Sequence, residues 1–436
     1  MSLKNNTSHG MTQEIVVKDS GLAISLKRLI GLCLFSIVLF LNYNLSSDYI
    51  SLLCTLLACW AVLTCKTDKF LPLALFFSSF AYLFRFTQYN IYFLIQICFI
   101  VRSLLIKSKI LRFIPLFFFY VIVHLISTDP STIRIGTFIP YISMFSLLVA
   151  SCLYKEEWRS SCIQYLLFGF LISSILGLGI ESNRLLTILD ENPIMMGNQT
   201  LFHRFGGLLP DCNFYTMFSV VVISIVALPF NAGISGKLRV LLLFALLMLG
   251  GITFSKSFYL SIIALFALML VSGGRGNIKF VLGLLFVGTM LYHFLSDYID
   301  LVLDVSFQRF LDSQGDAESF TNGRYDYWLM YLREILSSAD FILVGHGAEA
   351  LPHNIVAHNT YLEILYKFGA LGMIFNIIFM YVAKKNMVKN LKHQLFNYIP
   401  FLFLLALIFN LSAFSFYPLW SLFFVCFIAW NTPCLK

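Results

Sequence analysis

The chain has 436 residues, of which 59% are hydrophobic and only 12% are charged, and its formal net charge is +8. Soluble domains carry about 25% charged residues, so this composition excludes an ordinary soluble enzyme and indicates a membrane protein. The apolar runs approach the ~20 residues that a helix needs to cross about 30 Å of hydrocarbon. They lack the alternating polarity of an outer-membrane barrel. We therefore predict helices, because lipid offers backbone groups no other partner.

Fourteen candidate spans follow one another along the chain. Their centres lie near residues 37, 57, 78, 97, 118, 144, 171, 221, 247, 264, 287, 371, 403 and 423. Arg85 interrupts the sequence between the third and fourth centres. The predicted fold class is an all-α polytopic membrane protein of about 14 transmembrane helices, with residues 1–436 forming a single membrane domain.

Two longer polar segments, 181–212 and 297–358, are predicted as external loops. If the N-terminus is cytoplasmic, 15 of the 17 lysines fall on one side, which is the positive-inside bias. Both termini are then cytoplasmic and both loops face outward. The lysines on the cytoplasmic side account for most of the net positive charge, so nucleic acid is not a predicted partner. Ten cysteines without a Cys-x-x-Cys pair predict neither a disulfide framework nor a zinc site.

The larger loop, between the spans near 287 and 371, contains ten acidic residues, three arginines and no lysine. Apolar residues recur at helical spacing over 325–336, which predicts an amphipathic helix there. Gly345, Gly347 and Pro352 then predict a stretch rich in turns.

A helix that re-enters the membrane is predicted just after this stretch. Thr360 followed by Glu363 fits a capping box, so the helix begins at Asn359 or Thr360. Its free N–H groups would face the exterior, where they suit a phosphate. His358 precedes them, and an imidazole with a pKa near 6.5 suits proton transfer. The alternative is that His358 is only a polar residue at the membrane boundary.

Further along the same helix, the sequence predicts structural roles. Glu363 and Lys367 are four residues apart with the acid first, the favourable order for an ion pair. Gly369 and Gly372 would let another helix approach closely.

Arginine dominates the cations of the predicted external segments. Arg204 precedes a glycine-rich stretch that ends in Asp211 and Asn213, and Arg324 lies in a second such setting. The guanidinium fork suits paired phosphate oxygens better than an ammonium does. Lys256, at an outward turn between two spans, could add charge to a phosphate site. The alternatives are pairing of the arginines with loop acids and snorkelling of the lysine.

Three motifs in this order resemble the superfamily of bacterial O-antigen ligases and Wzy-type O-antigen or capsule polymerases. They cover roughly residues 200–375 and comprise Arg-x-Gly ending in Asp-x-Asn, Gly-Arg-x-x-x-Trp, and His-Asn followed by Gly-x-x-Gly. The residues that carry them are Arg204, Gly206, Asp211, Asn213, Gly323, Arg324, Trp328, His358, Asn359, Gly369 and Gly372. Family members often have Ser-Arg where this chain has Ser255 and Lys256. The lysine keeps the positive charge but lacks the two-pronged guanidinium of arginine.

The resemblance implies a glycosyltransferase of the C type in the bacterial inner membrane, with no metal and no cofactor. Its donor is an undecaprenyl-pyrophosphate-linked oligosaccharide presented outside, and its acceptor is a glycan or the lipid A-core. A flippase and a chain-length regulator are the implied partners. Arg204 and Arg324 would bind the donor diphosphate, and His358 would position or deprotonate the attacking hydroxyl. The remaining implied substrate-binding residues are Asn359, Trp328, Lys256, Asn213 and Asp211.

Three functions are compatible with these observations. We predict polymerisation of lipid-linked repeat units, because the chain combines fourteen spans with a long acidic loop. O-antigen ligase is the alternative, since the motifs are shared. A lipid-linked sugar flippase fits less well, because transporters usually show internal repeats and mid-membrane ionisable residues.

Overall fold

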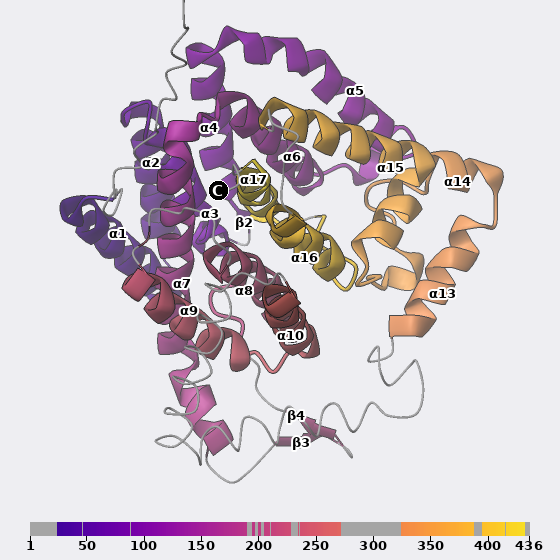
Figure 1. Cartoon of the computed structure of the whole chain (residues 1–436). Helices are drawn as coiled ribbons and strands as arrows, with labels where there is room; N and C mark the ends of the chain where they lie inside the picture. Colours follow the sequence, from indigo (N-terminus) through magenta and orange to yellow (C-terminus); the bar gives the residue numbers. More distant parts are fainter. Residues whose placement is uncertain are drawn as a thin grey trace, which may run out of the picture.

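The chain folds into a bundle of helices of very different lengths (Figure 1). The computed structural model describes residues 24–45, 47–87, 89–189, 194–196, 199–201, 205–209, 211–227, 234, 236–271, 324–387, 395–414 and 416–431. Its α-helices are α1 (Leu26–Leu45), α2 (Asp48–Thr64), α3 (Phe70–Ser78), α4 (Tyr92–Ile106), α5 (Ile114–Leu125), α6 (Ile135–Leu153), α7 (Arg159–Leu189), α8 (Cys212–Ala227), α9 (Gly236–Gly251), α10 (Lys256–Val271), α13 (Arg324–Ile335), α14 (Ala339–Val344), α15 (Thr360–Met387), α16 (Ile399–Ile408) and α17 (Leu419–Trp430). Short 3-10 turns are η1 (Ala81–Leu83), η2 (Ser108–Phe113), η3 (Pro130–Thr132), η4 (Glu156–Trp158), η5 (Pro352–Asn354) and η6 (Leu395–Tyr398).

The apolar helices make this an all-α membrane protein. Within the described residues, four stretches are long and apolar enough to cross a membrane, namely Ser108–Leu125, Ile135–Leu153, Glu156–Gly179 and Thr360–Met387. Thirteen of the predicted span centres fall inside an α-helix, and the centre near 287 lies outside the described residues. Helix α3 has only 9 residues, a rise of about 13 Å, which is under half of the hydrocarbon thickness. The number of spans therefore stays a prediction.

Two small hairpins interrupt the helices in predicted loop regions. Strands β1 (Arg85–Phe86) and β2 (Tyr89–Asn90) pair antiparallel where Arg85 was expected to interrupt the spans. Strands β3 (Ile194–Met196) and β4 (Gln199–Leu201) pair in the same way inside the predicted loop 181–212. Helix α7 continues to Leu189, so the first residues of the predicted external segment are helical.

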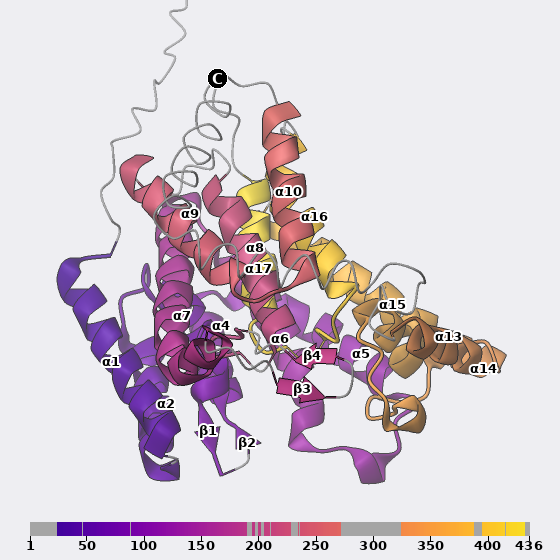
Figure 2. The same ribbon diagram turned by 90° about the horizontal axis from the view of Figure 1, so that it is seen from below.

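The helices pack with aromatic side chains at their contacts. Figures 1 and 2 show α1 and α2 at one edge of the molecule and α13 and α14 at the opposite edge. Helix α15 packs on α5 and α6, and α16 and α17 lie between it and α8. In the core, the ring of Phe170 stacks on that of Phe218 at 4.5 Å, and Phe117 stacks on Phe145 at 4.4 Å.

Helix α15 is kinked at Gly369, where φ is +62°. A Cβ added at Gly369 would lie 2.3 Å from the carbonyl oxygen of Leu343 in α14. One added at Gly345, where φ is +74°, would lie 2.5 Å from the backbone of Lys367. The two glycines thus dock α14 and the following turn onto α15. The predicted close approach at Gly369 is confirmed, although the partner is a six-residue helix and not a long span.

Gly372 is also tightly enclosed, but by a side chain of α15 itself and not by another helix. A Cβ there would lie 2.2 Å from the Cβ of Phe368 and 3.5 Å from Nε2 of His124 in α5. The glycine therefore makes room for Phe368 on the other side of the kink at Gly369, while the contact with α5 is of ordinary length.

Candidate functional site

Helix α13 confirms the predicted amphipathic helix, and it buries Tyr331 and Ile335 against α15. Its first residue is Arg324, whose Nη1 donates a hydrogen bond of 2.8 Å to the carbonyl oxygen of Asn410. Asn410 lies just beyond the end of α16, where helix carbonyls lack partners within the helix. The guanidinium of Arg324 therefore lies at the junction of α13 and α16.

The same helix also holds the segment that leads to His358. The indole Nε1 of Trp328 donates a hydrogen bond of 3.0 Å to the carbonyl oxygen of Ala357. The hydroxyl of Tyr331 donates one of 2.8 Å to the carbonyl oxygen of Ile355. These two bonds fix the backbone immediately before His358, so the position of the imidazole depends on α13.

His358 lies in a half-buried position with a left-handed backbone, φ +49°. Burial lowers the pKa of its imidazole below the ordinary value, and the guanidinium of Arg324 lowers it further. The carboxylates of Asp211 and Glu363 act in the opposite direction. Arg324 bonds Asn410 and Thr360 bonds the next residue, Leu411, so the start of α13 lies beside the start of α15 and near His358. The lowered pKa keeps the imidazole neutral near pH 7, when it can accept a proton.

Asn359 caps helix α15. Its Oδ1 accepts hydrogen bonds from the backbone N–H groups of Tyr361 and Leu362, at 3.1 and 3.2 Å. The helix begins at Thr360 as predicted, but the cap is Asn359 and not a Thr360–Glu363 box. Asn359 forms the cap because its side-chain oxygen reaches backbone N–H groups of the first turn, which have no partner within the helix.

The hydroxyl of Thr360 serves a different contact. It donates a hydrogen bond to the carbonyl oxygen of Leu411 and accepts one of 2.9 Å from the N–H of Ala413. Both partners follow α16, so the start of α15 is joined to the same chain segment that receives Arg324.

Glu363 and Lys367 form the predicted ion pair. The Lys367 Nζ and the Glu363 Oε1 lie 2.9 Å apart, and the side chains are only 16% and 7% exposed. The second carboxylate oxygen of Glu363 is buried and accepts no hydrogen bond from the described residues. A buried negative charge thus lies one turn below His358.

The start of α8 lies beside the segment after α16, where the ring of Phe214 stacks on that of Phe416 with centroids 4.5 Å apart. Asp211 caps α8, with its Oδ1 accepting a hydrogen bond of 2.5 Å from the N–H of Asn213. Nearby, the N–H of Phe205 donates one of 3.2 Å to the carbonyl oxygen of Ile252. Ile252 lies in the turn that leads to Lys256, the first residue of α10. The glycine-rich segment and the turn with Lys256 are therefore neighbours.

The structure thus relates most of the predicted site residues to one another. Arg324 and Asp211 influence His358 electrostatically, Trp328 holds the residue before it, and Asn359 follows it. Arg204, predicted to bind the diphosphate, lies outside the described residues.

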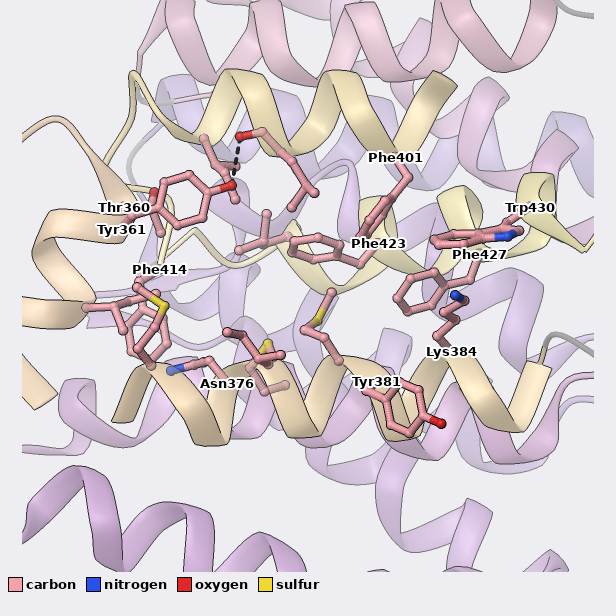
Figure 3. A pocket seen from close by; sticks show the side chains of 18 residues that line it. Thr360, Tyr361, Asn376, Tyr381, Lys384, Phe401, Phe414, Phe423, Phe427 and Trp430 are labelled. Carbon is pink, nitrogen blue, oxygen red and sulfur yellow. Dashed lines mark hydrogen bonds between the residues drawn. The ribbon is translucent and has the colours of Figure 1, made fainter. Parts of the chain in front are cut away.

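An apolar groove of about 390 Å³ starts beside this site and runs between α15, α16 and α17 (Figure 3). Thr360 and Tyr361 line one end, where the Tyr361 hydroxyl donates a hydrogen bond of 2.9 Å to the carbonyl oxygen of Leu405. At the other end, the Nζ of Lys384 lies 3.6 Å from the ring centroid of Trp430. The walls between them are almost entirely aliphatic and aromatic.

A polar network in the wall of the groove was not predicted. Asn376, which lines the groove, accepts a hydrogen bond of 2.8 Å from Tyr120 and donates one of 2.9 Å to Nε2 of His124. The other ring nitrogen of His124 lies 2.8 Å from the carbonyl oxygen of Tyr120. The signal was present in the sequence, because polar residues inside apolar runs are costly and usually have partners.

Asn410 was also missed as a site residue. It interrupts an apolar run just before Leu411 and Ser412, and its role depends on the fold, which brings α13 to the end of α16. Phe409 beside it packs against Trp328, with ring centroids 5.3 Å apart.

Comparison with protein-family models, with curated proteins and with solved structures finds no match to this chain. The chemistry of the site therefore has to be judged from its own residues. The guanidinium of Arg324 and the imidazole of His358, whose pKa is lowered, lie near the start of α15, where the apolar groove begins. Such a set can stabilise a developing anion and move a proton beside a lipid-soluble chain.

Proposed function

We propose that this chain is a membrane glycosyltransferase that polymerises undecaprenyl-pyrophosphate-linked oligosaccharide repeat units on the outer face of the bacterial inner membrane. The observation that supports it best is geometric: Arg324 and the start of α15, next to His358, both contact the segment after α16, beside an apolar groove. The order of the three sequence motifs supports the same assignment. The orientation follows from the lysine bias, which puts this site outside.

In the proposed reaction, a hydroxyl of the acceptor sugar attacks the anomeric carbon of the donor glycan. The new C–O bond forms as the bond from that carbon to the diphosphate oxygen breaks, and the diphosphate leaves with the electron pair. Arg324, together with Arg204, stabilises the charge that develops on the leaving group. His358 accepts the hydroxyl proton, for which its lowered pKa keeps it in the neutral form. Asp211 and Glu363 favour the imidazolium that results.

The groove gives the donor's isoprenoid chain a place to lie. It begins at Thr360 and Tyr361, which directly follow His358 and its neighbour Asn359 in the chain. A lipid held there would present its diphosphate at the mouth of the groove. Binding energy from such a remote, unreactive part of a substrate can be used to position the reacting centre.

The test uses the purified protein in nanodiscs with the lipid-linked repeat unit of the source strain. We expect release of undecaprenyl pyrophosphate and formation of longer glycans, detected by mass spectrometry, with and without EDTA. Arg324→Lys keeps the charge but loses the fork, and His358→Ala removes the base. We expect each to lower the rate by about a hundredfold or more. Activity that disappears with EDTA would contradict the metal-free reaction.

Matched controls lie nearby, one on α13 itself and one in the short turn η5 before His358. Arg333→Lys changes an exposed arginine of α13, and His353→Ala changes an exposed histidine with a similar left-handed backbone, φ +50°. Both controls should keep nearly full activity. Equal losses in the controls and the site variants would remove the specific roles of Arg324 and His358.

Deletion of the gene separates the polymerase from the ligase. A polymerase predicts loss of long chains with single repeats retained on the lipid A-core. Loss of every repeat from the core would instead indicate a ligase. Intact purified protein that moves lipid-linked sugar across vesicles without releasing undecaprenyl pyrophosphate would indicate a flippase.

A further inference from the structure

A second cleft lies far from this site, between helices α1, α2, α3 and α7. It has a volume of about 550 Å³, within the roughly 300–1,000 Å³ of small-molecule sites. Its apolar walls are built from three of these helices by Leu32, Phe35, Leu57, Leu73 and Phe77. Helices α1 and α2 lie at the edge of the bundle in both views (Figures 1 and 2).

The rim of the cleft is basic. Arg28, Lys66 and Lys69 all line it, at the end where α1 begins and α2 ends. The acid beside them is Asp68, 48% exposed, whose carboxylate lies 3.4 Å from the Nζ of Lys69. Arg102 adds a fourth cation behind the rim, where it donates to backbone carbonyls at the end of α2. Among the residues that the structure describes around the cleft, the cations therefore outnumber the acid, and the rim is net positive.

The cleft has open space next to α1. A Cβ added at Gly31, which lines it, would have no atom within 4 Å. Leu57 is 47% exposed although it forms part of the wall, whereas Phe77 is 2% exposed and forms the floor. The outer face of α1 exposes Ile30 and Leu34, by 51% and 59%. Because such a face is stable only against hydrocarbon, we take the cleft to open sideways into the bilayer.

We propose that this cleft binds an anionic phospholipid of the adjacent leaflet. Its phosphate pairs with Arg28, Lys66 and Lys69, and one acyl chain lies along Leu32 and the other apolar walls. Basic pockets between membrane helices are suited to anionic headgroups. A zwitterionic lipid would bring its own ammonium group to a positive rim. A free phosphate would leave the apolar walls uncovered, so the combination of rim and walls favours a lipid.

The role of the basic rim in lipid binding is tested by native mass spectrometry of the full chain with added phosphatidylglycerol or phosphatidylcholine. We expect the combined variant Arg28→Gln, Lys66→Gln, Lys69→Gln to bind phosphatidylglycerol about a hundredfold more weakly, since each of the three cations contributes on the order of a fivefold factor. The matched control neutralises three exposed cations elsewhere, Lys109, Arg112 and Lys155, and should bind like the unchanged protein.

The apolar walls are tested with a filling variant. Gly31→Leu should reduce phosphatidylglycerol binding severalfold, whereas Gly136→Leu, at an exposed helical glycine with equally open surroundings, should not. Circular dichroism and gel filtration confirm that each variant folds. The proposal is overturned if phosphatidylcholine binds as tightly as phosphatidylglycerol, if the charge variant binds normally, or if inorganic phosphate displaces the lipid while Gly31→Leu has no effect.

Discussion

The buried ion pair of α15 allows a quantitative prediction about stability. Lys367→Met would leave the carboxylate of Glu363, 7% exposed, without its partner at 2.9 Å. Removing one partner of a buried pair costs about 3–5 kcal/mol, because the remaining charge stays desolvated. Lys367 retains 16% exposure, so water can partly replace it, and we expect a loss near the lower limit, about 3 kcal/mol.

The assay is thermal unfolding of the purified protein in detergent at a fixed scan rate. A loss of this size should lower Tm by about 3 °C, at roughly 1 °C for each kcal/mol in a chain of 436 residues. The double variant Glu363→Met, Lys367→Met removes both charges and should recover most of the loss. Lys385→Met, at an exposed lysine of the same helix, is the control and should leave Tm nearly unchanged. If Lys367→Met also leaves Tm unchanged, the pair is not buried as described.

Two further predictions concern the turn on α15 and the titration of the site. Gly369→Ala should destabilise the protein by about 2 kcal/mol or more. The backbone of Gly369 is left-handed, and an added Cβ would lie 2.3 Å from the carbonyl oxygen of Leu343. Limited proteolysis of α14 measures the loss of stability, with Gly136→Ala as the tolerated control. The acid limb of the kcat/KM profile should lie below pH 6.5, because the lowered pKa of His358 delays protonation as pH falls. Asp211→Asn keeps the cap of α8 but removes a carboxylate that raises the pKa of His358, so the acid limb of the profile should move to still lower pH. A shift of the acid limb to higher pH would contradict the electrostatic assignment.

The sequence predicted the helices well, because apolar runs in a membrane protein leave few alternatives. It predicted the ion pair of Glu363 and Lys367 from spacing alone, since both lie on one helical face. It misidentified the cap of α15, because two adjacent residues could each cap and the choice depended on where α16 ends. The hydroxyl of Thr360 is engaged by Leu411 and Ala413, which are 51 and 53 residues away.

The sequence predicted the residue types of the candidate site, but not the contacts that hold these residues in place. His358, Arg324 and Asp211 were predicted from their motifs, and their roles stay predictions; the contacts of α13 with Asn410 and Ala357 place its start beside the segment around His358. The contact of Arg324 with Asn410 joins positions 86 residues apart, and no local pattern signals such a pairing. The groove was missed for the same reason, since it forms only where three separate helices meet.

The left-handed backbone at His358 limits which residues this position can accept. Glycine, asparagine and aspartate tolerate that conformation best, whereas β-branched residues resist it. In a complete substitution library at position 358, protein abundance and catalysis should therefore follow different rankings. Abundance should be highest for glycine and asparagine and lowest for valine and isoleucine, while turnover should require the imidazole, whatever the amount of folded protein.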